Sequence, residues 1–166
     1  MIEERCGYIS ITGFPNSGKS TLINTLLKKK ISIISSKVQT TKDEILGILN
    51  VNKTQFIFLD TPGIITNRKY YNKSMSREIF KSIDRVSCNL FVFDSSKEIN
   101  KEQENIINKT IIKFKKNLLI INKIDLVANE KLLTISKKLN EIFNFNQTFM
   151  IYAKKKKRYH KDCTNS

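Results

Sequence analysis

The sequence of 166 residues has no tryptophan, one histidine, two prolines, five glycines and three cysteines. So few glycines and prolines exclude a collagen-like or low-complexity chain, and a hydrophobic content of 40% excludes a disordered one. The cysteines (Cys6, Cys88 and Cys163) lie too far apart for a disulfide scaffold or a paired-cysteine metal site. No apolar run approaches the roughly 18 residues that span a bilayer, and the first residues include acids where a signal peptide has basic residues. We expect one globular domain in a reducing cytoplasm.

The formal net charge is +15, and only 5 of the 30 basic residues are arginine. The chain contains 25 Ile, 25 Lys and 17 Asn, all encoded by A/T-rich codons, so base composition can account for much of the lysine. We therefore interpret most lysines as a solvated surface. The net positive charge would still attract a phosphate-rich partner, so such a partner remains a possibility.

Short apolar runs alternate with helical patterns, which predicts an α/β fold. Strands are expected at residues 8–12, 45–51, 55–60, 90–93, 118–121 and 148–152. Helices are expected from residue 19 onward and at residues 73–83, 100–115 and 132–142, with loops at 28–43 and 61–72. The short turn between the second and third strands makes that pair antiparallel. Asn100 and Gln103 form a candidate capping box, and the uncharged strand at 90–93 indicates a sheet covered on both faces.

The strongest motif has the pattern GxxxxGK[ST], directly after a strand and at the start of a helix. Its members are Gly13, Phe14, Pro15, Asn16, Ser17, Gly18, Lys19 and Ser20, and Thr21 follows them. Glycines let the backbone approach phosphates, and the loop N–H groups with the helix N-terminus attract an anion. Lys19 is expected to reach the β- and γ-phosphates, and the Ser20 hydroxyl to bind Mg²⁺. This pattern predicts a nucleotide site.

A second motif, Asp60-Thr61-Pro62-Gly63, stands at the end of a predicted strand. Ligands of open α/β sheets bind at the carboxyl ends of strands. Asp60 is a candidate for holding Mg²⁺ through a water, and the Gly63 N–H for contacting the γ-phosphate.

A third motif, Asn122-Lys123-Ile124-Asp125, also follows a predicted strand. A carboxylate can accept two hydrogen bonds from the N1–H and N2–H₂ edge of guanine, and adenine has no such pair of donors. Asp125 therefore predicts selection of GTP over ATP.

Thr40 and Thr41 lie in the loop before the second predicted strand. One of the hydroxyls could close over Mg²⁺ only when a γ-phosphate is present. We favour Thr41 because it is nearer the strand.

In this order the motifs resemble those of the translation-factor-related GTPases, and in detail the Era-type GTPases. The stretches that match are GFPNSGKSTLINTLL, ISIISSKVQTTKDEILGI, FLDTPGI and LLIINKIDLV, within residues 7 to about 153. The resemblance implies a P-loop GTPase fold with a six-stranded mixed sheet flanked by helices. It also implies GTP hydrolysis with Mg²⁺, involving Lys19, Thr41 and Gly63, and a monomer that acts with 16S rRNA in small-subunit ribosome assembly. Its expected location is the cytoplasm, with peripheral association at the inner membrane.

Two positions bear on hydrolysis. Ras-like proteins have a water-orienting glutamine after the glycine of the second motif, and Ile64 stands there in this chain. In similar GTPases the asparagine that corresponds to Asn16 helps to bind K⁺ beside the phosphates. We expect slow intrinsic turnover that K⁺ or a partner raises.

The C-terminal part departs from the Era-type pattern. No two glycines are three residues apart, so the GxxG loop of an RNA-binding KH domain is absent. Tyr152-Ala153-Lys154 stands where relatives have Ser-Ala-Lys, which leaves a backbone contact from Ala153 to guanine. Residues 154–166 predict a basic, unfolded tail without a final covering helix. A frameshift in the codons of residues 154–157 would explain this.

Two alternatives remain open at this point. The chain could be a non-catalytic remnant that binds guanine nucleotide weakly or not at all, or a basic RNA-binding module acting through its lysine tail. His160 has no partner for acid–base catalysis in this tail.

Overall fold

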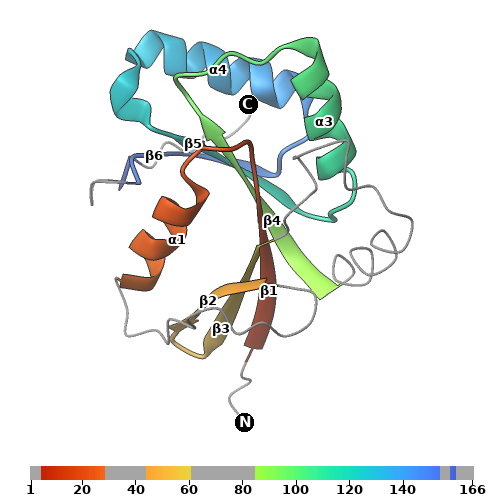
Figure 1. The fold of residues 1–166 in the computed structure, drawn as a ribbon, viewed down its shortest axis with the longest axis vertical. Helices are drawn as coiled ribbons and strands as arrows, with labels where there is room; N and C mark the ends of the chain where they lie inside the picture. Colours follow the sequence, from red (N-terminus) through yellow and green to blue (C-terminus); the bar gives the residue numbers. More distant parts are fainter. Residues whose placement is uncertain (1–4, 29–43, 61–84, 154–157, 160–166) are drawn as a thin grey trace, which may run out of the picture.

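The computed structural model describes residues 5–28, 44–60, 85–153 and 158–159 (Figure 1). The helix predicted at residues 73–83, the loop predicted at 61–72 and all but the first residue of the loop predicted at 28–43 lie outside these residues. That first residue, Lys28, ends the first helix, so the prediction of a loop is wrong there. The described part forms one mixed sheet with three α-helices.

Seven strands make up the sheet, in the order β2-β3-β1-β4-β5-β6-β7. They are β1 (Arg5–Thr12), β2 (Glu44–Val51), β3 (Thr54–Asp60), β4 (Val86–Asp94), β5 (Asn117–Asn122), β6 (Gln147–Ile151) and β7 (Arg158–Tyr159). The β2–β3 and β6–β7 pairs are antiparallel, and the other pairs are parallel. All six predicted strands are present, and the hairpin has the predicted antiparallel pairing.

The seventh strand corrects the prediction of a wholly unfolded tail. Arg158 and Tyr159 pair with the end of β6, so the prediction is wrong for these two residues. Backbone pairing with an open edge strand needs no apolar period, and a pattern-based prediction therefore does not detect it. The remaining tail residues, and with them the expected lack of a covering helix, lie outside the described part.

The α-helices are α1 (Lys19–Lys28), α3 (Lys101–Ile111) and α4 (Asn129–Ile142), and a short 3₁₀ helix, η2, spans Ile124–Leu126. The predicted capping box of α3 is confirmed, because the Asn100 side chain accepts from the Gln103 N–H at 2.8 Å and the Gln103 side chain accepts from the Asn100 N–H at 3.1 Å. None of the helices among the described residues is long and apolar enough to cross a membrane.

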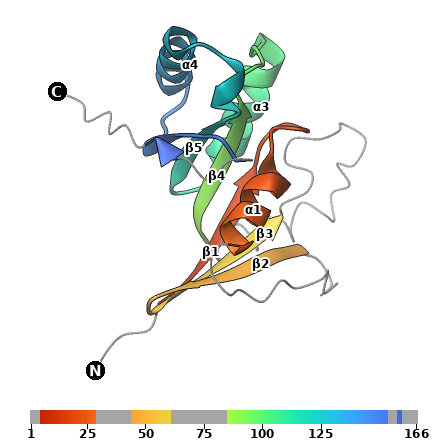
Figure 2. The same cartoon turned by 90° about the vertical axis from the view of Figure 1, so that its left-hand side faces the viewer.

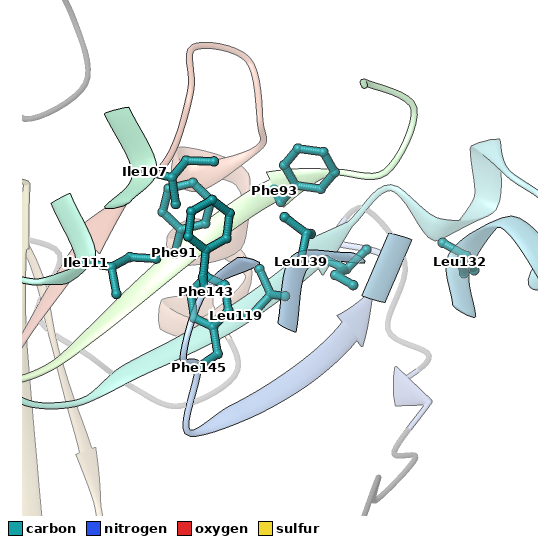
Figure 3. Close-up of a cluster of buried hydrophobic side chains, with 10 residues drawn as sticks. Phe91, Phe93, Ile107, Ile111, Leu119, Leu132, Leu139, Phe143 and Phe145 are labelled. Atoms are coloured by element: carbon teal, nitrogen blue, oxygen red, sulfur yellow. The ribbon is translucent and has the colours of Figure 1, made fainter. Parts of the chain in front are cut away.

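Helices cover both faces of the sheet (Figures 1 and 2). On one face α1 buries Leu22, Ile23 and Leu27 against a cluster that includes Val92 of β4. On the other face α3 and α4 pack over the aromatic cluster shown in Figure 3, which includes Phe91, Phe93, Ile107, Leu119, Leu139, Phe143 and Phe145. Successive side chains of β4 thus enter opposite clusters, and the predicted coverage of both faces is confirmed.

The parallel pairing brings the ends of four strands to one edge of the sheet. Ile11 pairs with Asp60, and Thr12 pairs with Phe91. Further along, Asp94 pairs with Asn122. The carboxyl ends of β1, β3, β4 and β5 therefore lie at the same edge of the sheet, and the motifs found in the sequence begin at three of these ends.

Candidate nucleotide-binding site

The loop between β1 and α1 has a backbone that two glycines make possible. Gly13 has φ +144° and Gly18 has φ +99°, values that residues with a Cβ atom rarely adopt. A Cβ atom at Gly13 would overlap the Val92 carbonyl oxygen, and one at Gly18 would overlap the amide nitrogen of the Asn122 side chain. The loop is thus packed directly against the ends of β4 and β5.

The side chain of Lys19 lies across this loop. Its Nζ donates to the carbonyl oxygens of Gly13 and Phe14, each at 2.9 Å. The ring of Phe14 packs edge-on against Phe91 in the aromatic cluster, which anchors the loop to the core. The amino group is therefore held against the loop by two of the loop's own carbonyl oxygens.

The remaining loop residues fall into an exposed and a buried group. Pro15, Asn16, Ser20 and Thr21 are exposed, and Asn16 has the left-handed conformation with φ 61° that asparagine tolerates well. Ser17 is 1% exposed, and its hydroxyl has no hydrogen-bond partner among the described residues. The exposed hydroxyl of Ser20 stands in the first turn of α1, where the helix N-terminus attracts anions.

The third motif contacts the loop between β1 and α1 (residues 13–18, called the phosphate loop below) directly through Asn122. This side chain is 2% exposed, and its Nδ2 donates to the Ser17 carbonyl at 2.9 Å. Its Oδ1 accepts from the Ala153 N–H at 3.1 Å. One buried amide therefore holds both the phosphate loop and the segment after β6.

Lys123 makes a second connection. It has φ 61°, and its Nζ donates to the Asn16 carbonyl at 2.8 Å and pairs with Asp94 Oδ2 at 2.6 Å. Its own carbonyl accepts from the Ser95 hydroxyl at 2.9 Å. These contacts fix the left-handed turn that leads into η2 and Asp125.

Asp94 has a lowered pKa. Burial on its own would raise the pKa, but the hydrogen bond from Lys123, two hydrogen bonds from Ser96 and the charge of Lys123 together lower it below the ordinary value. The Ser96 N–H and hydroxyl both donate to Oδ1, at 3.0 and 2.7 Å. Asp94 is therefore ionised near neutral pH and holds the Lys123 ammonium in place.

Asp125, the predicted guanine-reading carboxylate, lies in η2 and is exposed. Ala153 is buried, and its N–H already donates to Asn122. A contact from this N–H to guanine would require that hydrogen bond to be exchanged, so the role predicted for Ala153 stays a prediction.

Several predicted site residues cannot be placed. Asp60 ends β3 at the same edge, but its side chain is not among the described ones. The others that lie outside the described residues are Thr41, Thr61, Pro62, Gly63 and Ile64.

Three residues at this edge were not predicted from the sequence: Thr25, Asp94 and Ser95. Asp94 had a detectable signal, because it is an acid directly after the apolar run of residues 90–93. Thr25 had none, since its partner Ala153 is 128 positions away in the sequence.

Comparison with known proteins agrees with this geometry. The profile of the family described as "50S ribosome-binding GTPase" matches residues 8–123, from β1 to the lysine of the third motif. The chain belongs to this family.

Relatives and solved structures of Era match over nearly the whole chain. The GTPase Era of Afipia carboxidovorans is 38% identical over 149 residues, which are 90% of this chain and 48% of that protein. A crystal structure of Era in complex with MgGDPNP and nucleotides 1506–1542 of 16S ribosomal RNA has a TM-score of 0.67 and 36% identity, and covers 91% of this chain and 52% of that one. An Era variant of Aquifex aeolicus bound to GDP·AlF₄⁻ has a TM-score of 0.65 and 36% identity, and the match covers 89% of this chain and 51% of that one.

The chain thus spans about half the length of the Era proteins it matches. The resemblance to Era-type GTPases is confirmed over that half, and so is the expected P-loop GTPase fold. The predicted six-stranded sheet is extended here by the two-residue β7.

Proposed function

We propose that the chain binds guanine nucleotides and hydrolyses GTP to GDP and phosphate. The observation that carries the proposal is the pair of contacts from the third motif to the phosphate loop, Asn122 to the Ser17 carbonyl and Lys123 to the Asn16 carbonyl. They bring the predicted phosphate-binding and base-reading segments into one site, as a single nucleotide requires.

Each segment has a separate task in this proposal. The loop N–H groups and the N-terminus of α1 hold the phosphates, and Lys19 contributes a positive charge. Asp125, which faces solvent, accepts from the guanine edge and selects the base. The oxygen atoms of the Ser20 hydroxyl and the Asp60 carboxylate are donors of the kind that Mg²⁺ prefers, and bound Mg²⁺ would neutralise charge on the phosphates.

For hydrolysis itself, Thr41 and Gly63 are proposed to contact Mg²⁺ and the γ-phosphate. Structures of related Era proteins with MgGDPNP and with GDP·AlF₄⁻ support a guanine nucleotide and Mg²⁺ as ligands. Lys19 and the loop amides would stabilise charge on the phosphoryl oxygens in the transition state.

The biological setting is proposed from the same relatives. One Era structure contains a fragment of 16S rRNA, which supports small-subunit ribosome assembly as the process. We also propose that the chain is a cytoplasmic monomer with peripheral contact to the inner membrane. Cell fractionation tests the location, and a measurement of the molecular mass in solution tests the oligomeric state.

A thermal-shift experiment with and without nucleotide tests the proposed function. With Mg²⁺ present, GTP or GDP at about 100 times its Kd should add about 2.7 kcal/mol to the free energy of unfolding, and ATP should add nothing. In Asp125→Asn the stabilisation by GTP should fall and that by XTP should rise, because an amide donates where the carboxylate accepted. Glu130→Gln, an exposed acid in the first turn of α4, is the matched control.

If neither GTP nor GDP stabilises the chain, it is a non-catalytic remnant and the proposed function is wrong. If wild type and Asp125→Asn respond alike to every nucleotide, the base-reading role of Asp125 is wrong.

A further inference from the structure

Thr25 connects α1 with the segment that follows β6. Its hydroxyl lies 2.8 Å from the Ala153 carbonyl oxygen and 2.7 Å from the Thr21 carbonyl oxygen, one turn earlier in the same helix. A single hydroxyl proton is shared between the two acceptors. The contact to Ala153 joins parts of the chain that are 128 positions apart.

The peptide groups of Ala153 are therefore held on both sides. The N–H donates to Asn122 Oδ1 at 3.1 Å, and the carbonyl accepts from Thr25. Asn122 in turn donates to the Ser17 carbonyl. These bonds form one connected path from the phosphate loop through Asn122 and Ala153 to α1.

The path ends at the segment that follows β6, where Tyr152 precedes Ala153. Ala153 is 5% exposed, and a buried carbonyl without a partner would be costly. The Thr25 hydroxyl supplies that partner from the helix.

We propose that Thr25 is a positioning residue for guanine recognition: it holds the Ala153 segment against Asn122 and so slows release of the bound nucleotide. This inference rests on the proposed function, since it requires a guanine nucleotide in the site. It does not place Thr25 in contact with the nucleotide.

An ordinary structural role is the alternative, because threonine hydroxyls often bond to the carbonyl four residues earlier in a helix. Thr134 of α4 does this as well, with its hydroxyl 3.0 Å from the Glu130 carbonyl, and no further acceptor is recorded for it within the described residues. Thr134→Val is therefore a matched control that removes the same local bond without touching the site.

The experiment measures the release rate of fluorescently labelled GDP from the 166-residue chain and its variants. Thr25→Val and Thr25→Ala both remove the hydroxyl, but valine keeps about the helix propensity and the shape of threonine, whereas alanine raises the propensity. Both should release GDP about tenfold faster, which corresponds to about 1.4 kcal/mol, and discriminate less between GDP and IDP. Thr25→Ser should restore the wild-type rate, and Thr134→Val should leave it unchanged.

If Thr25→Ala is more stable than Thr25→Val, as helix propensity alone predicts, and both release GDP at the wild-type rate, Thr25 has only a helical role and the inference is wrong. If the wild-type chain does not bind labelled GDP at all, the proposed function is wrong and this inference with it. Binding by wild type with unchanged release in the variants overturns this inference alone.

Discussion

Asp94 and Lys123 show how one ion pair can connect two loops of the site. The carboxylate is buried at the end of β4, and the ammonium reaches from the third motif to the Asn16 carbonyl of the phosphate loop. Because the folded state lowers the pKa of Asp94, the ionised form stabilises folding. That contribution is complete above the ordinary pKa of aspartate, about 3.9, and is lost as the pH falls through the lower pKa of the folded state.

We predict that Asp94→Asn lowers the free energy of unfolding at pH 7 by about 1.5–3 kcal/mol, the usual value of a hydrogen bond to a charged group. As the pH is lowered below 5, the free energy of unfolding of the variant should also fall less than that of wild type, since the variant lacks the Asp94 carboxylate that becomes protonated. Urea denaturation across that pH range measures both effects. Glu98→Gln, an exposed acid four residues later, is the control, and an Asp94→Asn curve parallel to wild type would contradict the role of the pair.

Among the secondary-structure elements, α1 and β2 have an unusually close approach. Gly47 of β2 is buried, and a Cβ atom there would overlap the end of the Leu27 side chain on α1. Leu27 is 3% exposed and packs in the cluster beneath α1. The absence of a side chain at Gly47 thus sets how closely the helix covers this edge of the sheet.

We predict that Gly47→Ala destabilises the chain by about 1–3 kcal/mol, the range for overpacking a core. Leu27→Val in the same chain should recover part of that loss by giving the new methyl group space. Gly7→Ala is the matched control in the same sheet, because its Cβ would meet Ser87 Oγ at an ordinary 3.6 Å. Equilibrium denaturation compares the stability of these three variants. Equal stability of Gly47→Ala and Gly7→Ala would show that the close packing of α1 on β2 at Gly47 is unimportant.

Apart from β7, the types of the described strands and α-helices followed from the sequence, but some element ends did not. The predicted helix at 100–115 ends earlier, at Ile111. The helix end is capped from just outside the helix, because the Asn117 side chain at the start of β5 donates to the carbonyls of Ile111 and Phe114. A periodicity argument considers only the helix's own residues and cannot include a partner from the next strand.

For the molecule as a whole, the sequence revealed the motifs of the site but not the contacts that hold them together. Motif spacing predicted Lys19, Asn122 and Asp125 as site residues because phosphate and guanine chemistry requires those residue types. The contacts of Asp94 to Lys123 and of Thr25 to Ala153 depend on the tertiary fold. No local pattern marks Thr25, since a helical threonine has the same sequence signature whether or not it meets a second acceptor.

The rate of GTP hydrolysis depends on the whole assembled site, and substitution of Asn16 tests whether K⁺ contributes to that rate. We predict that GTP hydrolysis is about tenfold or more faster in K⁺ than in Na⁺, because a cation beside the phosphates would stabilise developing charge. Asn16→Gly keeps the φ of 61° accessible but removes the side-chain oxygen. It should retain GDP binding and lose the K⁺ stimulation, whereas Asn24→Ala, at an exposed position of α1, should keep both.

Single-turnover phosphate release in the two salts, at matched ionic strength, measures this. Equal rates of wild type in K⁺ and Na⁺ would rule out the cation effect.

The phosphate loop has one more consequence. Four of its carbonyl oxygens, those of Gly13, Phe14, Asn16 and Ser17, already accept from side chains of Lys19, Lys123 and Asn122. Oxygens engaged with the protein orient their peptide dipoles, and this leaves the positive ends of the loop amides for an anion. If the loop binds a triphosphate as proposed, three side chains already hold part of its backbone in place, which would reduce the reorganisation that binding requires.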